Sequence, residues 1–521
     1  MIQDIETLEP GATLRADACV IGTGHAGMEA ILALRRAGLS VVVAEGGRRG
    51  FSKAAQALTR MEVVGRPVVE PDPSAELTPY LAAELRGEAR IRQLSGNSNI
   101  WTGKWREFEP LDFKPRPHVP DSGWPVAHED LLPWYREVER DYGFPDFARF
   151  GQDEALAPLH ATLAGSGIAT TYHYWEAEPR RVAHHHGAEV EADPGVRVVL
   201  GANAVELGRG EGGRIERLRA RSLEGREIHL EAAHFVVALG GIESARLLLA
   251  SDGRDAGGIG NARDLVGRYF MDHPKLKRGR LHPGPRFGEI PDGAANFPRP
   301  RVKLCLSLDE ATQAREGLLN HILQLAPTPP EERDPRAALR RRRWGAAARL
   351  ALERRARGRG DGLSGEPVLA AFIVEQAPNR DSRVRLSDAR DALGMRRTVL
   401  DWRLTDLDAR SFERALQLLG ERLAAAGIGR LDYGDRAPSI EETIDCYHHM
   451  GTTRMGATPE TGVVDTDCRV FGTPNLYVAS SAVFPTGHSY GPTLTLVALA
   501  RKAASALVRH RGAAPALRTV A

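Results

Sequence analysis

Two adjacent histidines, His448 and His449, stand in the run CYHHMGTTRMG at residues 446–456. A neutral imidazole, with an unperturbed pKa of about 6.5, can take a proton from a hydroxyl group at neutral pH. The pair could instead belong to a metal site or form a buried hydrogen-bonded pair. Adjacent histidines alone give poor chelate geometry, and no third ligand stands near them in sequence, so we expect no metal here.

A second stretch with chemical meaning is the glycine turn GTGHAG, residues 22–27. Gly22 permits a tight turn, Gly24 lets the backbone approach a pyrophosphate, and Gly27 lets a helix lie close to a strand. Glu45 follows Gly22 by 23 residues, where an acid accepts hydrogen bonds from a ribose diol. The pattern predicts a dinucleotide site; the alternative is a glycine-rich turn in a ligand-free α/β layer.

The elements that must hold this turn follow from the hydrophobic pattern. A short apolar strand at 18–21 precedes the turn, a helix at 28–38 follows it, and Gly38 is a signal for the helix end. A second strand at 40–45 ends on Glu45. The order strand, glycine turn, helix, strand, acid is typical of a nucleotide-binding βαβ unit.

Two later stretches show the same succession of a strand, a glycine-containing turn or loop, and a helix. Residues 231–251 read as a strand, a Gly-Gly turn and a helix, and β-segments precede them at 196–207 and 213–232. Residues 473–508 read as a strand, a glycine-proline loop and a long apolar helix. The sequence therefore predicts an α/β fold with a doubly wound, Rossmann-like cofactor domain assembled from separated segments, beside an α+β substrate lobe with an antiparallel or mixed sheet. The expected cofactor domain comprises 1–60, 190–270 and 446–521, and the expected substrate lobe comprises 61–189 and 271–445.

A basic insertion near 331–360 interrupts the substrate lobe. It carries 11 arginines between Arg333 and Arg359 against two acids. We expect a solvated basic helix or loop at the surface; the alternative is a binding patch for an acidic partner or an anionic surface.

Composition narrows the classes of function. The 521 residues are 42% hydrophobic and 26% charged, with a formal net charge of +2, so charge gives no argument for nucleic-acid binding. The four cysteines are scattered without a CxxC pair, which favours reduced thiols inside a cell. The chain start lacks the features of a signal peptide, and no apolar run reaches the roughly 18 residues of a membrane span. We therefore expect a cytoplasmic protein.

Several motifs in one order make the chain resemble the glucose–methanol–choline (GMC) oxidoreductases, which oxidise alcohols with FAD. It is especially similar to the bacterial branch of sugar and polyol dehydrogenases and pyranose oxidases. The motifs are VIGTGHAG, LSGNSNIWTGKW, LDFKPRPHVPDSGWP, LGGIESARLLL, VGRYFMDHP, EQAPNRDSRVRLS and HHMGTTRMG with the TGVVDTDCRVFGTPNLYVASSAVFPTG that follows.

The resemblance implies FAD binding through the first glycine turn and Glu45, and it implies contacts from several further segments. The loop at 94–105 would run along the cofactor, residues 202–205 would meet the adenine, and later turns would close over its middle. The residues implied beyond the first turn are Asn97, Ser98, Asn99, Ala204, Val205, Gly240, Ala479, Ser480, Ser481, Pro492 and Thr493.

The same loop bears on how the cofactor is attached. Some relatives link the flavin covalently through a histidine, and here Ile100 stands at that place. Isoleucine has no nucleophilic atom, so we expect FAD to be bound without a covalent bond.

The resemblance also assigns the catalytic base. Counting back from Gly451 selects His448, which would take the hydroxyl proton while the hydride passes to flavin N5, and His449 would form the site wall. Relatives carry a second polar residue, Asn or His, where this chain has Gly491. Its role could pass to His488, Tyr490 or His449, or the substrate could supply its own donor.

The sequence thus predicts FAD-dependent oxidation of an alcohol on a sugar, polyol, glycoside or aminosugar-like compound. The alternative is a flavin-binding protein of the same fold with a non-redox, lyase-like or lost activity, because Gly491 offers no side-chain donor. The electron acceptor (oxygen, a quinone or a protein), the oligomeric state and the identity of the hydroxyl-bearing substrate stay open.

Overall fold

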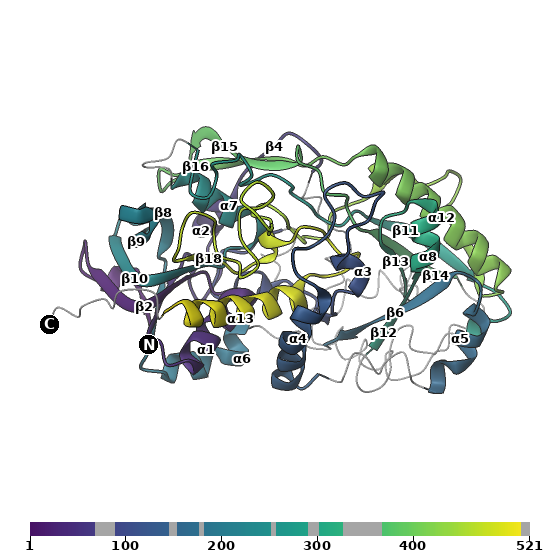
Figure 1. Cartoon of the computed structure of the whole chain (residues 1–521), viewed down its shortest axis with the longest axis horizontal. Coiled ribbons are helices and arrows are strands. Elements are labelled where there is room, and N and C mark those ends of the chain that lie inside the picture. The colour runs from purple at the N-terminus through teal and green to yellow at the C-terminus, as the bar shows by residue number, and fades with distance from the viewer. Residues whose placement is uncertain are drawn as a thin grey trace, which may run out of the picture.

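A computed structural model describes residues 1–67, 89–144, 154–176, 182–251, 257–289, 302–326 and 367–511. The expected basic insertion at 331–360 lies outside the described residues. The described chain forms two large sheets with a three-stranded sheet beside them, and helices cover their faces (Figure 1).

The first large sheet contains the glycine turn. Its strands follow the order β1-β7-β3-β2-β10-β9-β8, with β18 added to β10. The pairs from β1 to β10 and the β10–β18 pair are parallel, whereas β9 pairs antiparallel with β10 and β8. The strands are β1 Ile2–Asp4, β2 Thr13–Ile21, β3 Val41–Glu45, β7 Val196–Leu200, β8 Asn203–Arg209, β9 Ile215–Arg221, β10 Glu227–Val237 and β18 Leu476–Val478.

Helices cover both faces of this sheet, because its central strands are apolar on both sides. Val41 and Val43 pack in the cluster that contains α1 (His25–Arg36) and the end of α13 (Thr493–His510). Val42, between them, packs in the cluster that contains α7 (Gly240–Ala250). This alternation confirms the predicted doubly wound layer, and its strands come from three separated stretches of the chain.

The second large sheet is antiparallel throughout, in the order β17-β11-β14-β13-β12-β6-β5. Helix α12 (Asp406–Ala425) packs its apolar side on this sheet, where Phe412 meets the ring of Phe372 at 5.7 Å. The strands are β5 Lys104–Trp105, β6 Ile168–Trp175, β11 Lys275–Pro283, β12 Val302–Leu308, β13 His321–Ala326, β14 Val368–Val374 and β17 Gly429–Asp432. The predicted substrate lobe therefore has the expected antiparallel sheet.

The remaining elements surround these two layers. Strands β15 (Arg383–Arg390), β16 (Arg396–Asp401) and β4 (Glu62–Val63) form the three-stranded sheet. Helix α6 (Val182–Ala192) packs against α1 and crosses the predicted boundary at 189/190. The other helices are α2 Lys53–Gln56, α3 Pro110–Phe113, α4 His128–Tyr142, α5 Ala157–Leu163 and α8 Glu310–Glu316. Among the described helices none is both long and apolar enough to cross a bilayer.

Candidate active site

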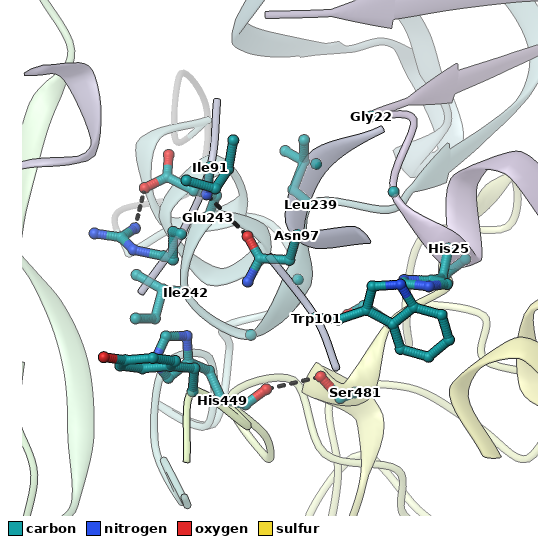
Figure 2. A pocket seen from close by; sticks show the side chains of 18 of the residues that line it. Gly22, His25, Ile91, Asn97, Trp101, Leu239, Ile242, Glu243, His449 and Ser481 are labelled. Carbon is teal, nitrogen blue, oxygen red and sulfur yellow. Dashed lines mark hydrogen bonds and ion pairs between the residues drawn. The ribbon is translucent and has the colours of Figure 1, made fainter. Parts of the chain in front are cut away.

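A cavity of about 430 Å³ lies between the two large sheets. One end is lined by the glycine turn after β2 and by the end of β3, and the other end by residues of β11, β13 and β14. Figure 2 shows the turn at Gly22, the start of α7 at Ile242 and the histidine segment at His449 around this space. The cavity thus joins the predicted cofactor turn to the predicted catalytic run.

The geometry at each of the three glycines of the turn is compatible with the role expected from the sequence. Gly22 has a φ of +99°, which favours glycine. A Cβ at Gly27 would lie 2.1 Å from the carbonyl oxygen of Gly22, so only glycine lets α1 start this close to β2. A Cβ at Gly24 would meet no protein atom within 4 Å, so the space beside this residue is open to a ligand at the N-terminus of α1.

Glu45 lies at the end of β3, where it lines the cavity. Its carboxylate accepts hydrogen bonds from the backbone N–H groups of Thr23 at 3.1 Å and Gly47 at 2.6 Å. Burial raises the pKa of Glu45, and these hydrogen bonds and the nearby Arg92 oppose that rise. The acid and the helix N-terminus together fit the ribose and pyrophosphate of a dinucleotide such as FAD.

The loop at 94–105 uses most of its polar side chains to hold its own shape. Asn97 lines the cavity, but its amide accepts from the N–H of Ile91 at 2.9 Å and donates to the carbonyl of Ala89 at 3.1 Å. Ser98 is buried and Asn99 bonds to backbone carbonyls of the loop, and neither side chain lines the cavity. Of these three predicted contacts, the cavity therefore includes Asn97.

Most other predicted cofactor residues lie at the cavity. Val205 and Ala479 are buried away from it, in the hydrophobic clusters beneath its wall. The predicted residues that line the cavity are Gly22, Gly24, Glu45, Asn97, Ala204, Gly240, Ser480, Ser481, Pro492 and Thr493, together with Ile100 at the place of the linking histidine.

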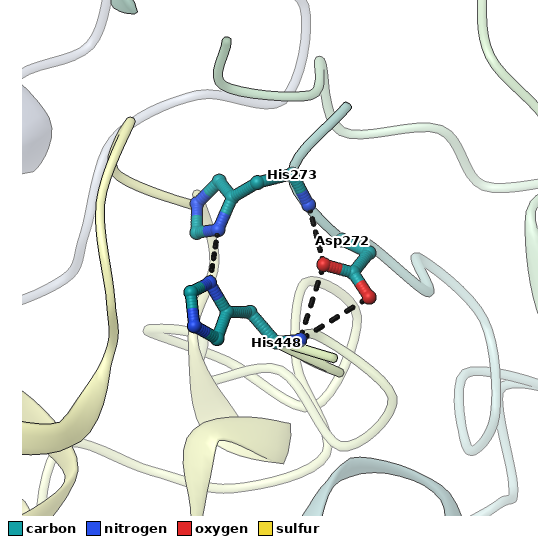
Figure 3. A group of neighbouring side chains, drawn as sticks. All are labelled: Asp272, His273 and His448. Atoms are coloured by element: carbon teal, nitrogen blue, oxygen red, sulfur yellow. Dashed lines mark hydrogen bonds between the residues drawn. The ribbon is translucent and has the colours of Figure 1, made fainter. Parts of the chain in front are cut away.

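His448 is held by a second histidine from a distant part of the chain. Met450 and Met271 exchange backbone hydrogen bonds, at 2.9 and 3.1 Å, which sets the two segments antiparallel. This pairing brings Nδ1 of His448 to 2.8 Å from Nδ1 of His273 (Figure 3). The sequence gives no signal for this contact, because the two residues are 175 positions apart.

The hydrogen bonds of His273 determine which nitrogen of His448 carries the proton. Nε2 of His273 lies against the backbone carbonyl of His488, which can only accept, so Nε2 carries a hydrogen and Nδ1 has the lone pair. Nδ1 of His273 must therefore accept from Nδ1–H of His448. Nε2 of His448 is then left with its lone pair, ready to accept a proton.

Asp272 fixes the backbone around both histidines (Figure 3). Its carboxylate accepts from the backbone N–H groups of His273 at 2.6 Å, Cys446 at 3.2 Å and His448 at 3.1 Å. Burial raises the pKa of Asp272 to about 7, and these N–H groups oppose that rise. Asp272, His273 and His448 have the side-chain types of a metal site and lie close together. Their hydrogen bonds to one another and to the backbone give them a structural role that needs no ion.

Nε2 of His448 faces the glycine that replaces the family's second polar residue. A Cβ built at Gly491 would lie 3.8 Å from both Cε1 and Nε2 of His448. Burial lowers the pKa of His448 well below its usual range, and the positive charge of Lys104 adds to this. His448 is thus neutral at physiological pH, with open space beside its basic nitrogen.

His449 lies beside the start of α7, near Ile242 (Figure 2). Its carbonyl accepts from Oγ–H of Ser481 at 2.7 Å, and its carbonyl and Cβ leave no room for a side chain at Gly241. Its Nε2 is buried without a hydrogen-bond partner among the described residues, 3.9 Å from Asp272. Burial lowers the pKa of His449 to about 3.

The two predicted replacements for the missing donor have other partners. The ring of His488 is buried, lies 2.9 Å from the Asp112 carboxylate and does not line the cavity. The contact of His488 with His273 is made by its backbone carbonyl. Tyr490 lines the cavity with its ring, while its hydroxyl bonds to His173 at 2.8 Å. Burial raises the pKa of Tyr490 well above its usual range, so the hydroxyl stays protonated.

Several lining residues were not singled out from the sequence. They share no local motif, because they come from strands of the second sheet or from the loop that leads into it. The residues are Arg90, Arg92, Lys104, Lys275, Lys277 and Gln324.

Comparisons with known proteins show which family and which fold the chain resembles. A family model described as GMC oxidoreductase matches residues 378–500. The chain is 26% identical over 569 residues to 6'''-hydroxyparomomycin C oxidase of Streptomyces lividus, covering 97% of this chain and 94% of that protein. It is 24% identical over 568 residues to 2-methyl-1,2-propanediol dehydrogenase of Mycolicibacterium austroafricanum, covering 95% and 96%. The solved structure of pyridoxine 4-oxidase from Mesorbium loti superposes with a TM-score of 0.58 at 18% identity, covering 95% of this chain and 99% of that one, so the fold is shared.

Proposed function

We infer from the GMC oxidoreductase family model over residues 378–500 and from the full-length relatives that the chain is a GMC oxidoreductase, and we propose that it oxidises a hydroxyl group of a sugar, polyol, glycoside or aminosugar-like compound. FAD is the cofactor that this family implies. The full-length relatives are named as an oxidase of a hydroxyparomomycin and a dehydrogenase of a propanediol. These names favour alcohol oxidation over the lyase-like or lost activity that Gly491 left open.

The observation that carries the proposal is the neutral His448 with its lone pair on Nε2, inside the cavity that begins at the glycine turn. Removal of a hydride from an alcohol carbon requires that the hydroxyl proton leave as well. A positioned base contributes typically about 10²–10⁴-fold to the rate of such a step.

The residues that would hold FAD are those at the turn end of the cavity. The N–H groups at the start of α1 would face the pyrophosphate, Glu45 the ribose, and the turn at Gly240 and the Ser480–Ser481 pair would face the middle of the cofactor. When bound, FAD supplies the hydride acceptor. Since Ile100 lines the cavity where some relatives have the linking histidine, we propose that FAD is held without a covalent bond.

The protein's own part is to place the substrate hydroxyl and to receive its proton. The hydroxyl would donate to Nε2 of His448 in the space left by Gly491. Nδ1 of His273 would hold the Nδ1 hydrogen of His448 throughout, and would stabilise the imidazolium once Nε2 is protonated. The low pKa of His448 means that this imidazolium gives its proton up readily after the reaction.

The test is reduction of the protein-bound flavin by candidate substrates without oxygen. Purified FAD-loaded protein would be mixed anaerobically with a panel of sugars, polyols, glycosides and amino sugars. The proposal expects bleaching of the absorbance at about 450 nm by at least one compound, with the matching carbonyl product. Bound FAD that no hydroxyl compound reduces, and that dithionite does reduce, would contradict it.

A further inference from the structure

Gln324 differs from the other buried glutamines of the described chain. Gln56, Gln313 and Gln376 each donate from Nε2 to a backbone carbonyl, at 2.6, 2.8 and 3.1 Å. Gln324 is equally buried, with 4% of its surface exposed, yet its Nε2 makes no hydrogen bond to any residue that the structure describes. A buried donor without a partner is costly, so this side chain calls for an acceptor from outside the chain.

The side chain of Gln324 faces the cavity. On β13, Leu323 and Leu325 pack in the cluster beneath α12, whereas Ile322 packs with Tyr490 on the opposite face. Side chains alternate along a strand, so Gln324 shares the face of Ile322. Gln324 also lines the cavity that the histidine run borders. The amide therefore points into the space where the proposed function places the substrate.

Gln324 lies on the side of the cavity that carries the loop of Gly491. Burial raises the pKa of Tyr490, and the nearby Gln324 amide is one of the groups that oppose this rise. The Tyr490 hydroxyl has its own hydrogen bond with His173, at 2.8 Å. Gly491, the next residue, borders Nε2 of His448. A compound that fills the space from His448 past Tyr490 would therefore bring a further oxygen to the amide.

We propose that Gln324 is a substrate-binding residue, whose Nε2 donates a hydrogen bond to a second oxygen of the substrate, one that is not oxidised. This inference rests on the proposed function and deepens it, because it names a residue that selects compounds with a second oxygen over simple alcohols. A carboxamide N–H donates without giving up its proton, so Gln324 orients the substrate and leaves the proton transfer to His448.

Two other acceptors would fit the same amide. The flavin could take its hydrogen bond, or a water molecule could fill the space beside it. The three cases differ in what they predict, because only a contact with the substrate makes the contribution of Gln324 depend on an oxygen of the substrate.

The experiment measures ligand binding and flavin reduction separately on the FAD-loaded full chain. D-Glucose and cyclohexanol, which share a six-membered ring and a ring hydroxyl, would each be titrated without oxygen. The flavin difference spectrum reports binding, and bleaching reports reduction. Gln324→Met should weaken glucose binding about 3- to 10-fold and change cyclohexanol binding by less than about twofold.

Deoxy sugars then locate the oxygen that Gln324 contacts. The probes are 2-deoxy-, 3-deoxy-, 4-deoxy- and 6-deoxy-D-glucose. One of them should bind to the wild-type protein about as weakly as glucose binds to Gln324→Met, and it should lose no further affinity in that variant, because the interaction is already absent.

The melting temperature separates this role from a structural one. Gln324→Met removes no hydrogen bond to a described residue, so the sugar-free, FAD-loaded protein should melt at the wild-type temperature or above it. Gln313→Met is the matched control, because Nε2 of Gln313 donates to the carbonyl of Leu308. It should melt lower and keep the wild-type affinity for glucose. Gln324→Asn keeps an amide and should retain part of the affinity.

Three results would overturn the proposal. The first is glucose binding that Gln324→Met leaves unchanged, or weakens no more than cyclohexanol binding. The second is a changed FAD content or flavin spectrum of sugar-free Gln324→Met, which would assign the amide to the cofactor. The third is the absence of any spectral change with glucose and its deoxy analogues near their solubility limits.

Failure of this inference and failure of the proposed function can be told apart. Glucose that binds through Gln324 but never bleaches the flavin would support the inference and count against the proposed oxidation. Bleaching by glucose that does not depend on Gln324 would support the oxidation and count against the inference.

Discussion

His273 should control the rate of flavin reduction although it never touches the substrate. In His273→Leu the acceptor for Nδ1–H of His448 is lost. A buried donor left without a partner costs about 1–3 kcal/mol, so His448 would move its proton to Nε2, where the open space beside Gly491 lets it be solvated. Since about 1.4 kcal/mol is a factor of ten, the population of the reactive tautomer should fall by about 5- to 150-fold.

Two matched variants separate positioning from packing. His273→Asn keeps an acceptor near the place of Nδ1 and should stay within about tenfold of the wild-type rate. His273→Gln keeps a donor near Nε2, toward the carbonyl of His488, and should behave like His273→Leu.

The assay is anaerobic stopped-flow reduction of the FAD-loaded proteins, with bound FAD quantified first. The rate of flavin reduction by the wild-type protein should stay constant across neutral pH. The His273→Leu variant should be slower at every pH, because the substitution changes the tautomer of His448 and not its charge. A His273→Leu variant that reduces its flavin at the wild-type rate would refute this reasoning. Equal losses in the Leu and Asn variants would assign the effect to packing.

Four further predictions follow from the same structure. Acid precipitation should release all FAD into the supernatant, because Ile100 cannot form a covalent link; yellow colour in the pellet would contradict this. Gly27→Ala should destabilise the apoprotein, since its Cβ would lie 2.1 Å from the carbonyl of Gly22, whereas Gly24→Ala should leave apoprotein melting unchanged and weaken FAD binding by about tenfold or more; equal melting temperatures for the two variants would argue against it. The acid limb of the pH profile of flavin reduction should lie well below pH 6.5, because burial lowers the pKa of His448; an inflection near 6.5 would count against a buried neutral base. Burial lowers the pKa of His449 to about 3, so the unfolded chain binds its proton first as the pH falls, and this side chain lowers the free energy of unfolding by about 1.4 kcal/mol per pH unit between about pH 6.5 and 3. Urea titrations should therefore show that the free energy of unfolding falls less steeply with decreasing pH in His449→Phe than in the wild-type protein. Equal slopes in the two proteins would contradict the assignment.

The sequence predicted the cofactor layer well because its signals are local. The helix after the glycine turn ends at Arg36, and Gly38 just beyond it has a φ of +80°, as its position as an end signal requires. The three glycine roles and the acid at the end of β3 follow from short spacings that one unit of structure must satisfy.

Contacts between distant segments could not be read in this way. The pairing of Met271 with Met450 decides which histidine holds His448, and no periodicity connects residues that far apart. The same limit explains His488 and Tyr490, whose loop position was right for the site while the ring of one and the hydroxyl of the other turn to Asp112 and to His173.

The lysines that line the cavity show a third kind of limit. Lys104 on β5 and Lys275 and Lys277 on β11 come from strands that lie far apart in the sequence, so no local pattern predicts that they line one cavity. Asn97 lies in a motif that the sequence did reveal, but its side-chain amide bonds to the backbone of Ile91 and Ala89 and so holds the loop in shape.

The assignment of His448 as the base and His449 as the wall is tested most directly by anaerobic stopped-flow reduction of His448→Ala and His449→Ala, each with its FAD content measured. The account predicts that His448→Ala binds FAD and loses about 10²–10⁴-fold in the rate of flavin reduction. His449→Ala should lose about tenfold or less through altered packing. A His448→Ala protein that reduces its flavin at the wild-type rate, with the loss in His449→Ala instead, would contradict the central claim.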